Sequence, residues 1–150
     1  MINITITEQI SVITFGNIPY DNESAFITAI FKEAAVKKIN IDMISKAAVS
    51  TDRTSVGFTF SDEDMPEMLE VLSKVNFYRP PLVSCGNVKV VVQSGEMAGN
   101  CGFAMNVFDA LARIAITPIL ITTSIDEISV VVRESDSIDF EKELRNCFSK

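Results

Sequence analysis

A glycine-rich segment containing Gly95, Gly99 and Gly102 lies between a predicted strand and a predicted helix. Such a loop could present backbone N–H groups and the positive end of the helix dipole to the carboxylate of a bound amino acid. Its spacing matches neither of the common nucleotide-binding motifs, Gly-x-x-x-x-Gly-Lys-Ser/Thr and Gly-x-Gly-x-x-Gly. Two interpretations stay open: a loop that binds an amino acid, and tight turns that use glycine without a ligand.

A second group of polar residues, Asp21-Asn22-Glu23-Ser24, stands where a helix is predicted to begin. These side chains could pair with the ammonium group of an amino acid, but the same residue types are favoured as helix caps. In the strand predicted next, Asp42 either lines an interface pocket or faces water. Lys46 either contacts a ligand carboxylate or is a solvated lysine of a hairpin.

The residue types exclude several kinds of enzyme. The chain contains no histidine, which removes Ser-His-Asp and Cys-His nucleophiles and His-ligated metals. Its three cysteines are far apart and form no Cys-x-x-Cys motif, so neither a disulfide framework nor a thiolate metal site is expected. The acidic residues of 62–67 stand at a predicted helix start, where acids complement the helix dipole. We therefore expect a binding protein without catalytic residues, metal or cofactor.

Charge and hydropathy narrow the possible partners. The formal net charge of −7 disfavours binding to nucleic acid and to anionic membranes. The longest apolar stretch, 110–121, is interrupted by polar residues and proline and is too short to span a bilayer. The first fifteen residues lack the cationic leader of a signal peptide. A cytoplasmic location is the expectation.

Hydrophobic periodicity predicts alternating strands and helices. Four helices are predicted. The first begins with the caps at 21–22 and ends near Lys38, and the other three cover 65–74, 99–114 and 136–148. Strands are predicted over 2–7, 10–15, 39–48, 55–60, 82–84, 87–93, 117–122 and 127–132.

The sequence repeats with an offset of 77 residues. The apolar helix positions Phe26, Ile30 and Ala34 then coincide with aromatic or aliphatic residues in the second half. The strand predicted after this helix, 39–48, also matches its counterpart in the second half. The next strand, 55–60, matches once three extra residues are allowed in the first hairpin. Two related βαββα units follow from this repeat.

The predicted class is α+β, with two ferredoxin-like βαββαβ units. Each unit would have a four-stranded antiparallel sheet with its helices on one face. We expect one domain over 8–80 and a second over 81–150. The second unit lacks a fourth strand of its own, so strand 1–7 is expected to cross over and join it. Exposed edges and the open sheet face favour a homodimer.

Two stretches carry a family resemblance: Ile39-Asn40-Ile41-Asp42-Met43-Ile44-Ser45, and Ile121-Thr122-Thr123-Ser124 with 128–132. With them, the chain resembles the tandem ACT-domain regulatory region of bacterial aspartokinases over essentially all of its length. Nothing in it resembles the amino-acid kinase domain. In place of the Gln-Asn that this family carries after the first long strand, the chain has Lys46-Ala47.

The resemblance implies allosteric sensing of an amino acid of the lysine or threonine class, in lysine biosynthesis. The implied partners are a second copy of the chain and an aspartokinase catalytic chain. The alternative is an ACT-fold interaction module that has lost effector binding. The implied effector-binding residues lie in the two strand-to-helix loops and the strands that follow: Asp21, Asn22, Ser24, Ala25, Asp42, Ser45, Lys46, Gly99, Asn100, Gly102 and Thr117.

Overall fold

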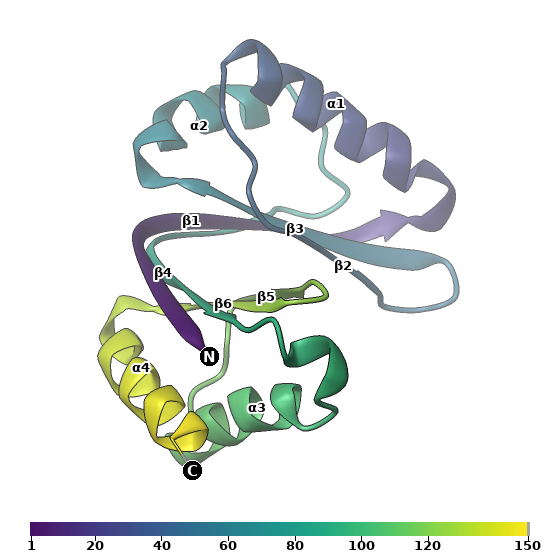
Figure 1. The fold of residues 1–150 in the computed structure, drawn as a ribbon. Coiled ribbons are helices and arrows are strands. Elements are labelled where there is room, and N and C mark those ends of the chain that lie inside the picture. The colour runs from purple at the N-terminus through teal and green to yellow at the C-terminus, as the bar shows by residue number, and fades with distance from the viewer. Residues whose placement is uncertain (150) are drawn as a thin grey trace. The chain divides into compact units, whose positions relative to one another are not determined.

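The structure, a computed structural model, describes residues 1–149 and contains six strands and four α-helices (Figure 1). The strands form an antiparallel sheet in the order β2-β3-β1-β4-β6-β5. The chain divides into two compact units. The first unit is Gln9–Cys85, and the second unit is Met1–Glu8 together with the chain from Gly86 onward. Lys150, the last residue of the predicted second domain, lies outside the described residues.

The first unit has its two α-helices on one face of its strands (Figure 1). Its core consists of buried residues from both helices and the strands, and Phe58 lies at its centre in ring contact with Phe15, Phe31 and Phe60. The elements in this unit are most of β1 (Asn3–Pro19), η1 (Tyr20–Asn22), α1 (Glu23–Val36), β2 (Ile44–Ala48), β3 (Arg53–Ser61), η2 (Asp62–Asp64), α2 (Met65–Ser73) and the start of β4 (Leu82–Gln93).

The second unit likewise has α3 and α4 packed together on one face of its strands (Figure 1). The alternating residues Ile2, Ile4 and Ile6 at the start of the chain pack against its buried core. This is the packing expected of a first strand that crosses over to the second unit. The other elements here are the rest of β4, η3 (Met97–Gly99), α3 (Phe103–Arg113), β5 (Leu120–Thr123), β6 (Glu127–Arg133) and α4 (Glu134–Phe148).

The internal repeat is visible in the two cores. Residues offset by 77 occupy equivalent buried or partly buried helix positions, since both Ile30 and Val107 have no exposed surface. Phe26 and Phe103 likewise pack on the core of their own unit. The sequence repeat therefore corresponds to a repeat of packing.

The structure differs from the predicted strands in two ways. Strands 2–7 and 10–15 are one continuous strand, β1, and strands 82–84 and 87–93 are one strand, β4. Gln9 has a φ of 57° and Gly86 a φ of 66°, so each strand has a residue in the left-handed region near its middle, and β1 has a second such residue near its end, Asn17, with a φ of 56°. Residues 39–43 are not part of β2, which begins at Ile44, although the Asp42 N–H still donates to the Thr59 carbonyl.

No helix among residues 1–149 combines the length and the apolar character that crossing a bilayer requires. The same residues contain no group of three or more acidic or cysteine side chains arranged to bind a metal ion.

Gly86→Ala should lower the free energy of unfolding by about 1 kcal/mol, because a side chain disfavours the left-handed φ of this residue. A Cβ atom at Gly86 would meet no atom within 4 Å, so steric contact would add nothing. The matched control is Gly95→Ala, which also introduces a Cβ into open space but at ordinary φ. Urea unfolding followed by circular dichroism measures both. Equal effects of the two substitutions would contradict the prediction.

Candidate functional site

The first unit contains a cavity of about 270 Å³ between the start of α1 and the hairpin of β2 and β3. We call it the Glu23–Lys46 cavity. It combines an acid, a base and two hydroxyl groups with an apolar wall, which is the mixture expected of a small-molecule site. Its lining residues are Glu23, Ser24, Ile27, Thr28, Ile44, Lys46 and Val56.

Strand geometry explains why these residues meet. Side chains two positions apart on a strand share a face, so Ile44 and Lys46 both lie on the side of β2 that faces the cavity. Lys46 pairs with Val56 of β3 across the hairpin, and Val56 is buried in the core. Glu23 is the first residue of α1, and the helix start places its side chain beside Lys46.

An ion pair crosses the cavity. Lys46 Nζ lies 2.8 Å from Glu23 Oε1, and the Glu23 side chain is only 13% exposed whereas that of Lys46 is 49% exposed. The Lys46 ammonium also lies 5.6 Å from the centre of the Tyr20 ring, within range of a cation–π contact. The base of this pair is therefore accessible, while the acid is mostly covered.

The pair changes the ionisation of both groups. The hydrogen bond from Lys46 lowers the pKa of Glu23. The same hydrogen bond with Glu23 raises the pKa of Lys46. Both side chains are thus charged at neutral pH.

Beneath the ion pair lie two buried polar atoms. Glu23 Oε2 and Thr54 Oγ1 are shielded from solvent and have no hydrogen-bond partner among the described residues at normal hydrogen-bond geometry. Thr54 is completely buried. The buried side of the carboxylate is therefore not accessible from the cavity, and the accessible side is occupied by Lys46.

Two of the predicted effector-binding residues, Ser24 and Lys46, line this cavity together. Five others belong to the same unit but do not line it: Asp21, Asn22, Ala25, Asp42 and Ser45. Ser45 lies between Ile44 and Lys46 and faces the other side of the strand.

The capping interpretation of Asp21 and Asn22 is not what the structure shows. Asn22 is the N-cap residue of α1, but neither it nor the cap of η1 makes a side-chain capping hydrogen bond. Asn22 Nδ2 instead donates to the hydroxyl of Tyr78 at 3.3 Å. The N-cap of α1 therefore provides no side-chain hydrogen bond to the helix.

The remaining predicted residues, Gly99, Asn100, Gly102 and Thr117, lie in the second unit and do not line the Glu23–Lys46 cavity. Asn100 Oδ1 accepts a hydrogen bond from the Gly102 N–H at 2.9 Å, and its carbonyl accepts one from the Phe103 N–H at 3.1 Å. Two of the N–H groups expected to face a ligand carboxylate are therefore used within the loop. Neither Gly99 nor Gly102 has a positive φ, so no left-handed turn requires glycine there.

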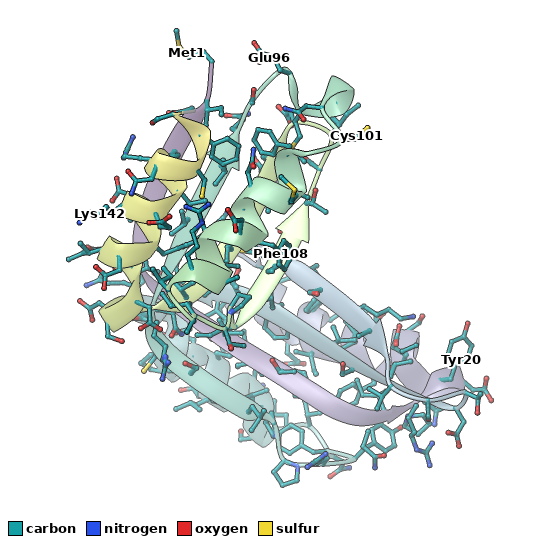
Figure 2. The ribbon with its side chains drawn as sticks, turned by 90° about the horizontal axis from the view of Figure 1, so that it is seen from below. Met1, Tyr20, Glu96, Cys101, Phe108 and Lys142 are labelled. Carbon is teal, nitrogen blue, oxygen red and sulfur yellow. The ribbon has the colours of Figure 1, made fainter. Side chains whose placement is uncertain are left out.

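A larger cavity of about 420 Å³ lies in the second unit, between the start of β1 and the end of α4. The Met1 ammonium lies 3.4 Å from Glu96 Oε1 at its edge, and the two residues are neighbours in Figure 2. Arg145, which also lines it, is paired with Glu141 on its own helix. The charged groups here are highly exposed, so this cavity is a weaker candidate for a specific site.

Sequence reasoning did not identify the apolar wall of the Glu23–Lys46 cavity, formed by Ile27, Ile44 and Val56, nor the buried hydroxyl of Thr54. The signal that could have found Ile44 is its two-residue spacing from Lys46. Val56 and Thr54 depend on the register of the hairpin, which the sequence pattern left open by several residues.

Each of the two units has a pair of helices on one face of its strands, which defines a tandem α+β fold, and comparison with known proteins identifies which one. The fold is that of the regulatory region of aspartate kinases. The regulatory subunit of aspartate kinase from Thermus thermophilus, in its ligand-free form, matches with a TM-score of 0.85 at 21% identity over 97% of this chain and 96% of that one. The predicted α+β fold of ACT-like units is confirmed.

E. coli aspartokinase III, in a structure with lysine and aspartate, matches with a TM-score of 0.70 at 20% identity over 97% of this chain and 32% of that one. In sequence, the chain is 30% identical over 145 residues to the aspartokinase of Geobacillus stearothermophilus, covering 97% of this chain and 35% of the relative. No family model matches. The chain spans about a third of the length of the curated aspartokinases that it matches. Residues 1–149 hold the regulatory fold and no kinase catalytic domain.

Glu23→Gln should remove a pH-dependent contribution to stability. The folded-state pKa of Glu23 lies below its ordinary value of 4.5, so its ionised form adds stability that is fully present above that pH. This contribution is lost as the pH falls through the lower folded-state pKa. The difference in urea midpoint between wild type and Glu23→Gln should therefore be greatest near pH 7 and shrink toward pH 3.

The matched control for this titration is Glu63→Gln, which removes an exposed carboxylate of the same unit. The urea midpoint of this variant should change with pH as that of the wild type does. A difference in urea midpoint between wild type and Glu23→Gln that stays constant from pH 7 to pH 3 would contradict the assignment of an ionised, paired Glu23.

Proposed function

We propose that this protein is an allosteric regulatory module that binds a free amino acid in the Glu23–Lys46 cavity. The observation that carries the proposal is a charged pair at a small cavity with an apolar wall, at the start of a helix without a capping side chain. The coarser conclusion, a regulatory role, is supported by the similarity to the regulatory regions of aspartokinases.

An amino acid can be held there by complementary groups. Its carboxylate pairs with the accessible ammonium of Lys46 and with the positive end of the α1 dipole. The hydroxyl groups of Ser24 and Thr28 can accept hydrogen bonds from its α-ammonium group. Its side chain then lies against the wall of isoleucine and valine.

The effector belongs to the class of lysine and threonine in this proposal. Lysine is present in the similar E. coli aspartokinase III structure. The residues that the resemblance implied in the second unit, Gly99, Asn100, Gly102 and Thr117, remain candidates for a separate effector site within that unit.

The regulated partner in this proposal is an aspartokinase catalytic chain in the cytoplasm, and the module acts as a homodimer. Regulation follows from population shift: an effector that binds one conformation more tightly than another raises the population of that conformation. The catalytic chain responds to whichever conformation is populated. The similarity to a regulatory subunit of aspartate kinase from Thermus thermophilus supports the proposed partner.

One observation favours a second candidate, an interaction module without an effector. Lys46 is already paired with Glu23, so the chain partly satisfies its own cavity. In that case the fold would contact the catalytic chain independently of amino acids.

A thermal-shift panel of the twenty amino acids separates these two candidates. An effector at about 100 times its dissociation constant should stabilise the native state by roughly 2.7 kcal/mol, since it binds the folded chain alone. A shift with at least one amino acid supports the regulatory module. No shift with any of them would contradict it and favour the interaction module. Co-purification with a co-expressed aspartokinase catalytic chain tests the partner, and its absence would remove that part of the proposal.

A further inference from the structure

Resting on the proposed function, we infer that the Glu23–Lys46 cavity selects a neutral amino acid and excludes lysine. The inference concerns which acidic groups the cavity can offer to a ligand. Glu23 is the one carboxylate among the seven residues that line it.

That carboxylate has no oxygen left for a cationic side chain. Oε1 is 2.8 Å from the Lys46 ammonium, and Oε2 is buried away from solvent beside Thr54. A ligand cation could reach the carboxylate only by displacing Lys46. The displaced ammonium would then lie near the ligand cation, and like charges repel.

The net charge of the cavity leads to the same result. Glu23 and Lys46 sum to zero, and a neutral amino acid is a zwitterion that also sums to zero. Lysine adds a second ammonium group without a second carboxylate to pair with it. Burying an unpaired charge against the apolar wall of Ile27, Ile44 and Val56 is unfavourable.

The cavity wall suits a short side chain of the threonine or valine type. Three aliphatic side chains form it, and at about 270 Å³ the volume is small for a ligand site. The selectivity therefore has two sources. The apolar wall attracts a short aliphatic side chain, and the lack of an acidic partner in the cavity disfavours lysine.

Isothermal titration of the wild-type protein with threonine, valine and lysine tests the inference. Threonine or valine should bind at least about tenfold more tightly than lysine, the factor expected for one unpaired charge. Equal or tighter binding of lysine would overturn the selectivity and leave the proposed function intact. Binding of no amino acid would overturn both.

Variants of Lys46 test which group holds the ligand carboxylate. Lys46→Gln should weaken the binding of the preferred neutral amino acid by at least about tenfold, through loss of a charge-assisted hydrogen bond. Lys46→Arg keeps the cation and should retain most of the affinity, provided that circular dichroism shows both variants folded. The matched control is Lys142→Gln on α4, an exposed lysine of the second unit (Figure 2). Unchanged affinity in Lys46→Gln would overturn the inference.

A gain of lysine binding provides the sharpest test. Ile44→Glu adds a carboxylate to the cavity wall at a residue that is already 49% exposed, so the fold should tolerate it. This variant should bind lysine at least about tenfold more tightly than wild type, because the second ammonium group then has a partner. Ile125→Glu, at a 77% exposed residue of the second unit, is the charge-matched control. Lysine affinity that is unchanged in Ile44→Glu would contradict the inference.

Discussion

The core of the second unit depends on residues from the opposite end of the chain. Ile2, Ile4 and Ile6 pack against buried residues that come from 88 onward, so this core is complete only when the first strand has joined it. Burial of apolar side chains is the main favourable term in folding, and a unit of this size buries too little apolar surface to lose part of it without loss of stability. The covalent continuity of β1 therefore makes the second unit dependent on a strand that also belongs to the first.

The repeat offset of 77 residues was the most informative signal in the sequence because it reflects packing. Helix positions such as Phe26 and Ile30 recur in the second half, and the structure places both copies on equivalent cores. The four helices and most strands were predictable from periodicity for the same reason. The extension of β1 beyond Phe15 and the continuity of β4 were not, because Gly16-Asn17 and Cys85-Gly86 have the composition of turns. In the structure β1 continues past Asn17 with a register shift, and β4 continues through Gly86 with a positive φ.

The candidate site was only partly predictable. Ser24 was identified because it stands in a polar loop before a predicted helix, and Lys46 because it takes the place of the Gln-Asn that the resembled family carries after its first long strand. The apolar wall could not be, since Val56 meets Lys46 only through the hairpin register, and that register depends on tertiary packing. The capping interpretation of Asn22 was wrong: its backbone is helical, with a φ of −105° and a ψ of −1°, and its side chain makes no capping hydrogen bond. Its amide nitrogen donates to the hydroxyl of Tyr78, a partner distant in the chain that local propensity could not anticipate.

The duplication also explains why the two units offer different chemistry. With the offset of 77, Glu23 corresponds to Asn100 and Lys46 to Thr123, so the second copy has neutral residues where the first has an ion pair. Asn100 then satisfies backbone N–H groups of its own loop, whereas Glu23 must be paired because an isolated buried carboxylate is costly. Lys46 therefore serves two roles: it compensates the buried acid, and its exposed half gives the cavity its cation. The ion pair that the proposed function uses to hold an amino-acid carboxylate is therefore present in one copy of the repeat and not at the equivalent positions of the other.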